Sequence, residues 1–357
     1  MLDIPTQRLA NQRISHTDLK TPAEVLAWMG PMQGQDYTGA LWSVGLRLPH
    51  SHESAIEQAL SDKTIVRTWI MRGTLHLVAA ADIRWLLDLI GPKIVKGMVR
   101  RYRELELDAE TLTRSADILA QALQDGQQMT RKELLALLEQ NGIVTTGQRA
   151  PHLLQYASYL GLICHGLTRL NNPTYRLLDE AFPAGITARD EAAAELARRY
   201  FLSRGPTTLQ NFVAWSSLLI SEARAALEAI TSEIVSDTIN GETYWRPASA
   251  PTVPQDAPTL YLLPGFDEYL IGYRDRSDIL DPTYADRICP GGNGIFYPTI
   301  VSDGQVVGTW KRTLKKGTVT ITPQPFITLS EAERHAFAEA AQRYGAFLGL
   351  SVVLAEV

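Results

Sequence analysis

The order of helical and extended segments constrains the fold of this chain more than any other feature of the sequence. Two helical segments followed by a two-stranded ribbon are predicted three times before residue 250. The pattern is clearest after residue 110, where Thr130 and Glu133 form a capping box at the start of one helix and Pro151 lies at the start of the next. Two alternating strands then flank the turn at Asn171-Asn172-Pro173. Helix, helix and ribbon is the order of a winged helix; a helical hairpin beside a small sheet is the alternative.

Domain boundaries follow from this order and from one proline-rich stretch, residues 246–254, which we interpret as a linker. After it, short strands alternate with turns at Asp303-Gly304 and Lys316-Gly317, and Ser330 with Glu333 caps a final helix before a closing strand. We therefore expect an α+β protein: three tandem winged-helix units followed by a small C-terminal antiparallel β-barrel with a terminal helix. The predicted domains are residues 1–110, 111–185, 186–250 and 258–357.

Composition excludes several classes of protein. The 357 residues are 45% hydrophobic and 20% charged, as in ordinary globular proteins, and contain no apolar run long enough for a membrane span. The N-terminus lacks the pattern of a secretory signal, and Cys164 and Cys289 have no metal-finger spacing. Nucleotide-binding, zinc-protease and α/β-hydrolase motifs are missing as well. We expect a cytoplasmic protein with no cofactor, no metal site and no membrane partner.

The segment Gln33-Gly34-Gln35-Asp36 is the first candidate site. Gly30, Pro31 and Gly34 all oppose a helix, and in an extended segment residues i and i+2 point to the same side. Two convergent amides offer donors and an acceptor to a water molecule or a polar ligand. The alternative is a solvated loop between helices.

A predicted hairpin at residues 65–78 is the second candidate site. Strand alternation places Thr74 and His76 on one face of the returning strand, and Arg67 and Arg72 add two guanidinium groups. Such side chains bind phosphates. The alternative is ion pairing with acidic residues of neighbouring helices.

The strand around Trp310 is the third candidate site. Four basic residues and no acidic one lie between Asp303 and Glu331, so this segment is locally basic on a chain of net charge −5. An aromatic ring beside basic residues suits nucleic acid. The alternative is an edge strand that lysines protect against aggregation. The basic residues are Lys311, Arg312, Lys315 and Lys316.

Two adjacent carboxylates, Asp267 and Glu268, form the fourth candidate site. Paired carboxylates can serve in acid–base chemistry. We favour the alternative, a charged turn in which they pair with Arg274 and Arg276.

Taken together and in this order, these four segments resemble the AlkZ-like DNA glycosylases, a family of winged-helix DNA-binding proteins. The resemblance extends over nearly the whole chain and rests on residues 32–36 with 40–42, 67–76, 264–270 and 310–312. It implies a C-shaped molecule with a basic concave surface for duplex DNA. The family's catalytic element has two polar residues flanking an apolar one, and it maps onto Gln33 and Gln35. Gly34 stands where an apolar residue is usual, and a glycine there loosens the element.

The resemblance implies a monofunctional DNA glycosylase that hydrolyses the N-glycosidic bond of alkylated purines, with bulky or crosslinked adducts as possible substrates. A base alkylated at a ring nitrogen is already a good leaving group, so the enzyme mainly positions a water and stabilises a cationic sugar. Gln35 is the expected main water contact and Gln33 its partner. Because the segment has no lysine, no Schiff base is expected.

The expected partner is double-stranded DNA with alkylated bases, bound by a monomeric enzyme at the nucleoid. The expected DNA-binding residues are Arg67, Arg72, His76, Trp310, Lys311 and Arg312.

Two other interpretations remain open. A non-catalytic winged-helix protein, such as a transcriptional regulator, would read a DNA groove with a helix of the second unit. The side chains for that task would be Arg149, His152, Gln155 and Tyr156. A family member that has lost activity is the other alternative, and Gly34 is the feature that favours it.

Overall fold

The structure is a computed structural model that describes residues 2–169, 172–178, 182, 185–186, 188–249, 251 and 257–355. The chain divides into two compact units, one made of Met1–Glu57 with Ala194–Val357 and the other of Gln58–Ala193. The first unit is therefore built from two separate stretches of sequence. This division is coarser than the four predicted domains, which remain a prediction. Within the ranges above, no helix is long and apolar enough to cross a membrane.

The N-terminal stretch of the first unit consists of short helices, and the first two begin at side-chain caps. Thr21 accepts a hydrogen bond from the Glu24 amide at 3.2 Å and so caps α2, and Gly30 ends the same helix with a φ of 68°. The elements are α1 (Ile4–Asn11), α2 (Pro22–Met29), β1 (Met32–Gln33), α3 (Tyr37–Gly45) and α4 (Glu53–Ser61).

The middle of the first unit contains helices followed by a two-stranded ribbon, the order that the sequence predicted. The hairpin turns at Asn240-Gly241, where both residues have positive φ, as the Asn-Gly motif favours. The elements are α10 (Arg189–Arg204), α11 (Leu209–Ser216), α12 (Ile220–Glu228), β7 (Ile234–Ile239) and β8 (Glu242–Pro247). The predicted linker overlaps β8 at its start, and residues 250 and 252–256 lie outside the described part of the chain.

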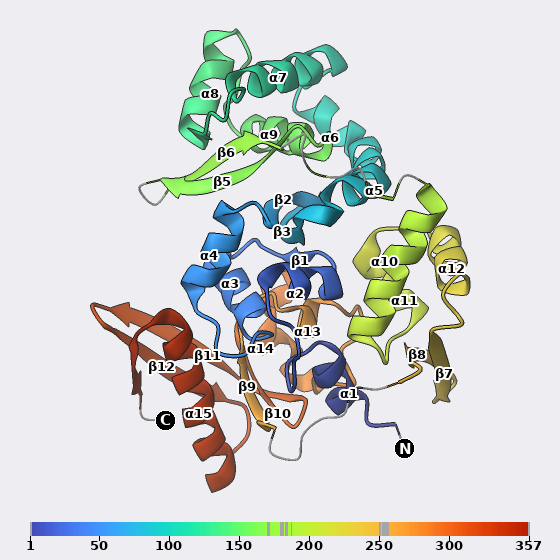
Figure 1. The fold of residues 1–357 in the computed structure, drawn as a ribbon, viewed down its shortest axis with the longest axis vertical. Coiled ribbons are helices and arrows are strands. Elements are labelled where there is room, and N and C mark those ends of the chain that lie inside the picture. The colour runs from blue at the N-terminus through green and yellow to red at the C-terminus, as the bar shows by residue number, and fades with distance from the viewer. Residues whose placement is uncertain are drawn as a thin grey trace. The chain divides into compact units, whose positions relative to one another are not determined.

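The C-terminal stretch of the first unit contains a five-stranded sheet in the order β13-β12-β11-β10-β9. Its strands are β9 (Leu260–Leu263), β10 (Thr299–Ser302), β11 (Gln305–Lys315), β12 (Thr318–Pro325) and β13 (Ser351–Leu354). Between β9 and β10 lie α13 (Glu268–Ile271), η2 (Pro282–Tyr284), α14 (Ala285–Ile288) and η3 (Pro290–Gly292). The long helix α15 (Glu331–Leu348) begins at the predicted capping box of Ser330 and Glu333 and lies along this sheet (Figure 1).

Two features of the sheet differ from the predicted antiparallel barrel. The last strand, β13, pairs with β12 in parallel, because α15 crosses back over the sheet and returns the chain in the same direction. Among the described strands, β9 and β13 are the two edges, so the sheet is open. The coarse prediction of an α+β fold is confirmed.

The second unit has its own helices, ribbon and core. The predicted hairpin at residues 65–78 is formed by β2 (Ile65–Met71) and β3 (Thr74–Ala79), which turn at Arg72-Gly73. In the other ribbon the predicted turn residues Asn172 and Pro173 belong to β6, and Asn171 lies outside the described residues. The remaining elements are η1 (Ala80–Asp82), α5 (Ile83–Gly97), α6 (Val99–Glu104), α7 (Ala109–Ala122), β4 (Met129–Thr130), α8 (Arg131–Gln140), α9 (Arg149–Tyr159), β5 (Ile163–Arg169) and β6 (Asn172–Leu177).

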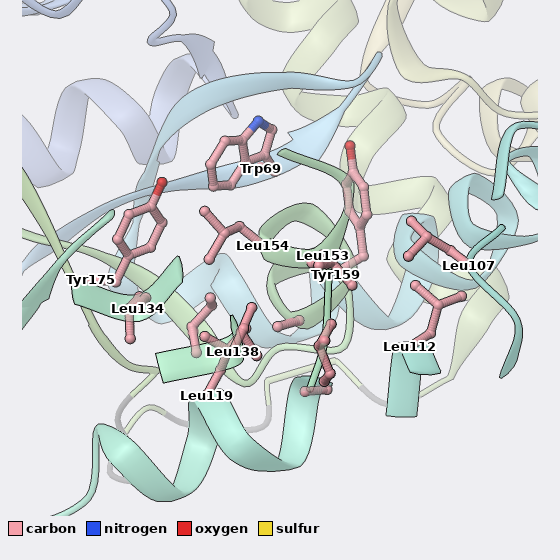
Figure 2. Packing of buried hydrophobic residues seen from close by; sticks show 14 of the residues in the cluster. Trp69, Leu107, Leu112, Leu119, Leu134, Leu138, Leu153, Leu154, Tyr159 and Tyr175 are labelled. Atoms are coloured by element: carbon pink, nitrogen blue, oxygen red, sulfur yellow. The ribbon is translucent and has the colours of Figure 1, made fainter. Parts of the chain in front are cut away.

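The core of the second unit is aliphatic between the helices and aromatic at the ribbons. Figure 2 shows Leu119, Leu138 and Leu154 packed between α7, α8 and α9. Trp69 of β2 lies against the same cluster, and its ring stacks on Tyr175 with centroids 6.2 Å apart. This shared cluster joins the hairpin to the helices behind it.

A buried ion pair ties the N-terminal stretch of the first unit to its C-terminal stretch. The guanidinium of Arg47 donates to both carboxylate oxygens of Asp267 at 2.9 Å, and both side chains have zero exposure. Ser43 and the amide of Tyr269 donate to the same carboxylate. Burial alone raises the pKa of Asp267, but the Arg47 charge and these hydrogen bonds together hold the pKa below its usual value.

We expect Arg47→Leu to lower the free energy of unfolding by about 3–5 kcal/mol at neutral pH, because it leaves a buried carboxylate without its partner. The stabilisation from Asp267 in the native protein is present above the unfolded pKa and is lost as the pH falls through the lowered folded pKa. In the variant, burial raises that pKa, so the loss relative to the native protein shrinks on acidification. Urea unfolding at about pH 8 and about pH 5 measures this difference.

The control for this prediction is the double variant Arg47→Leu with Asp267→Leu. Replacing both partners by apolar side chains removes the unpaired charge, so the pH dependence of the loss should disappear. A loss from Arg47→Leu alone that is the same at both pH values would contradict the assignment.

Candidate functional site

The Gln33–Gln35 segment lies between α2 and α3 of the first unit. Gly30 ends α2, β1 is extended through Gln33, and Asp36 occupies the N-cap position of α3 with β-region backbone angles. The prediction of an extended conformation is confirmed at Gln33. The side chain of Gln33 is half-buried and that of Gln35 is exposed, so both amides lie at or near the surface.

A second buried ion pair fixes the backbone on both sides of Pro31. The amide of Gln33 donates to one carboxylate oxygen of Glu268 at 3.2 Å. The other oxygen accepts from Arg204 at 2.6 Å and from the indole of Trp215 at 2.9 Å. Arg204 also donates to the carbonyl of Met29 at 2.6 Å. One ion pair therefore holds both the end of α2 and the start of the glutamine segment.

The partners of the adjacent carboxylates differ from those expected. We predicted that Asp267 and Glu268 pair with Arg274 and Arg276, but they pair with Arg47 and Arg204. Arg276 instead donates to the carbonyl of Leu270. The reason is geometric: Asp267 caps α13 and Glu268 is its first residue, so both carboxylates point into the unit rather than along their own loop.

Arg312 of β11 lies at the start of α3, directly after the glutamine segment. Its guanidinium donates to Thr38 Oγ1 and to the hydroxyl of Tyr344. Arg312 also lines a small cavity together with Asp36. The preceding residue, Lys311, points to the opposite side of β11 and is exposed. Strand alternation thus gives one basic residue that contacts α3 and one that faces solvent.

Trp310, which we expected to contact DNA, has its ring inside the unit. Trp310 is 3% exposed, and its indole donates to the carbonyl of Leu263 at 2.9 Å. The ring packs edge-on against Tyr344 of α15 with centroids 5.1 Å apart. Trp310 therefore joins β11 to β9 and α15.

The basic residues of the β2–β3 hairpin are more buried than expected. Arg67 is 8% exposed and lies 3.3 Å from Nδ1 of His165. His76 is fully buried, with Nε2 3.3 Å from the Arg72 guanidinium and Nδ1 3.0 Å from the carbonyl of Thr74. Arg67 and His76, which we expected to contact phosphates, are thus both buried. Arg72, half-buried at the turn, is the hairpin cation that lies nearest to solvent.

His165 remains neutral at physiological pH. Its burial, and then the charge of Arg67, lower its pKa to about 3. A neutral imidazole can accept a hydrogen bond from Arg67, and this contact leaves His165 a positioning residue rather than an acid–base group. Among the residues that the structure describes, no three histidine, cysteine or carboxylate side chains come together as they would around a metal ion.

The residues proposed for a groove-reading helix have structural tasks. Arg149 donates to the carbonyls of Val144 and Leu105 at 2.8 and 2.6 Å, so its guanidinium ties the start of α9 to the preceding loops. His152 and Tyr156 both pack edge-on against Tyr102. These contacts favour a packing role for this face of α9.

Comparisons with known proteins agree with the resemblance seen in the sequence. The family model described as DNA glycosylase AlkZ-like matches residues 26–347. A Streptomyces sahachiroi protein named interstrand DNA cross-link repair glycosylase is 26% identical over 337 residues, which cover 89% of each chain. The solved structure of Streptomyces sahachiroi DNA glycosylase AlkZ has the same fold, with a TM-score of 0.80, 22% identity and coverage of 99% of this chain and 98% of that one. Because the family model matches most of its length, this chain belongs to the AlkZ-like family of DNA glycosylases, enzymes that act on N-glycosidic bonds of DNA.

Proposed function

We propose that the protein is a monofunctional glycosylase that releases alkylated purines from duplex DNA, with Gln33 and Gln35 positioning the attacking water. The observation that carries this proposal is the glutamine segment itself, held at its backbone by Glu268 and Arg204. Bulky and crosslinked adducts are included among the proposed substrates, in keeping with the name of the Streptomyces sahachiroi relative.

The proposed chemistry suits amide side chains. An N-alkylated purine carries positive charge, so the glycosidic electron pair passes to the base without prior protonation. Water then adds to the cationic sugar carbon and releases a proton to solvent. An amide is too weak a base to remove that proton, but it can orient the water through its donors and acceptor. Because the segment contains no lysine, the proposal includes no covalent Schiff-base step.

The proposed DNA contacts use the cations that reach the surface, of which Lys311 is exposed and Arg312 and Arg72 are half-buried. We propose that Lys311, Arg312 and Arg72 contact phosphates, while Arg67, His76 and Trp310 position them from inside the units. The helix, helix and ribbon segments remain our candidates for tandem winged-helix units, and the C-terminal sheet our candidate for a partial barrel. We propose that the enzyme acts as a monomer.

We expect Gln35→Ala to lower the rate of base release by about 10²-fold or more, because the attacking water loses its main contact. The measurement is single-turnover release of 7-methylguanine from a duplex, revealed by alkali cleavage at the abasic site. DNA affinity should change only a few-fold. Gln210→Ala, which removes another exposed glutamine of the first unit, is the control and should leave the rate unchanged. A normal rate for Gln35→Ala would refute the assignment.

We expect Lys311→Ala to reduce the salt dependence of duplex binding by about 0.9 in the slope of log K against log salt, because one phosphate contact is lost. Fluorescence anisotropy titrations over a range of salt concentrations give this slope. Lys20→Ala removes an exposed lysine from the same unit and serves as the charge-matched control. Equal slopes for Lys311→Ala and the native protein would show that Lys311 of β11 does not contact DNA.

We expect Glu268→Gln to release the backbone at Gln33, because the neutral amide leaves Arg204 buried without a counter-charge. Hydrogen exchange at the Gln33 amide should become faster, and base release should slow with little change in DNA affinity. Asp281→Asn, which neutralises an exposed carboxylate in the same unit, is the control. Unchanged exchange at Gln33 together with a normal rate would show that the pair does not position this segment.

A further inference from the structure

A second hollow lies beside the candidate site, at the junction of the loop before β10 with strands β11 and β12. Its volume is about 350 Å³, within the range of small-ligand pockets. We call it the Tyr297 groove. It is lined by Arg287, Tyr297, Pro298, Thr309, Trp310, Lys311, Gln324 and Phe326.

The charge of the Tyr297 groove is positive. Arg287 and Lys311 are both exposed, and none of the described lining residues is acidic. A chain of net charge −5 therefore carries a local excess of two positive charges at this hollow. Such an excess favours an anionic ligand.

The groove also presents aromatic surface. Tyr297 is 45% exposed, so much of its ring is open to solvent. The Arg287 guanidinium, also in the lining, lies 3.9 Å from the centroid of Phe326, whose ring is 4.8 Å from that of Tyr284. This stack holds the Arg287 charge at the rim of the hollow. Thr309 and Gln324, hydrogen-bonded to each other, add polar edges to the wall.

The backbone around the groove is fixed before any ligand arrives. The Tyr297 amide donates to the carbonyl of Ile288 at 3.0 Å, and the Trp310 amide donates to that of Pro298 at 3.2 Å. The amide of Phe326 donates to Val307 at 2.8 Å. A site whose walls are held in this way loses little conformational entropy on binding.

The groove adjoins the residues that follow the glutamine segment. Pro298 and Trp310 line both the Tyr297 groove and the small cavity that contains Asp36 and Arg312. The groove and this small cavity therefore have two lining residues in common.

We propose that the Tyr297 groove binds one nucleotide of a DNA strand that has left the helical stack, with its base on the Tyr297 ring and its phosphate between Arg287 and Lys311. The pairing of an exposed ring with flanking cations is the chemistry that recognises an unstacked nucleotide. This inference rests on the proposed function, because a damaged or crosslinked duplex is the substrate that presents such nucleotides. Its test does not require base release.

The test compares the affinity of the full chain for two undamaged duplexes, one fully paired and one with a single unpaired thymidine. We expect the native protein to favour the bulged duplex. Tyr297→Ala should weaken binding of the bulged duplex by about tenfold, the usual effect of losing one base-stacking ring, and leave the paired duplex unchanged. Tyr297→Phe keeps the ring and should retain the preference. Leu354→Ala, which trims another exposed apolar side chain of the unit, is the matched control.

A second variant tests the phosphate contact. Arg287→Ala should lower the salt slope for the bulged duplex by about 0.7 to 0.9, and Arg287→Lys should largely restore it. Arg224→Ala removes an exposed arginine elsewhere in the unit and should leave the slope unchanged.

The two proposals fail separately. Absence of a preference for the bulged duplex, or a preference that survives Tyr297→Ala, would overturn the groove even if the native protein releases alkylated bases. Conversely, a preference that depends on Tyr297 in a protein that releases no base would support the groove and refute the proposed reaction.

Discussion

The ion pair of Arg204 and Glu268 is the interaction on which the rest of the candidate site depends. Both side chains are buried, and between them they bind the carbonyl of Met29 and the amide of Gln33. Two charges in a protein interior are costly unless their geometry is good and their remaining polar atoms are satisfied. Here Trp215 and Ser203 supply further hydrogen bonds. The main role of the pair is therefore to position the backbone at the start of the glutamine segment.

The neighbouring pair of Arg47 and Asp267 fixes the end of α3 in the same way. Two consecutive residues at the start of α13 thus hold two different elements of the N-terminal stretch, one through each carboxylate. Helix α13 has only four residues and is hardly stable by itself. It matters because it directs the side chains of Asp267 and Glu268. The segments before and after the glutamines are anchored from one short helix.

The features that the sequence predicts well are those decided within a few residues. The caps at Thr21 and Ser330 and the hairpin turn at Asn240-Gly241 depend on local hydrogen bonds and backbone angles, so their motifs suffice. The partners of Glu268 lie 64 and 235 residues away, and no local pattern specifies them. The direction of β13 depends on the path of α15 across the sheet, and the burial of Trp310 depends on which face of β11 that helix covers. Sequence reasoning therefore located the glutamine segment and missed what holds it.

The discontinuity of the first unit has a consequence for the order of assembly. Arg47 is synthesised 220 residues before its partner Asp267, and the second unit, a continuous stretch, is made in the interval. Domains fold as units during synthesis, and the entropy of closing so long a loop must be met before its contacts form. The contacts of α1 to α3 with the C-terminal stretch must therefore wait for α13, and the Gln33 amide gains its bond to Glu268 only after the ribosome has passed that residue. A nascent chain stalled before that point would carry the catalytic residues proposed here without the geometry to use them.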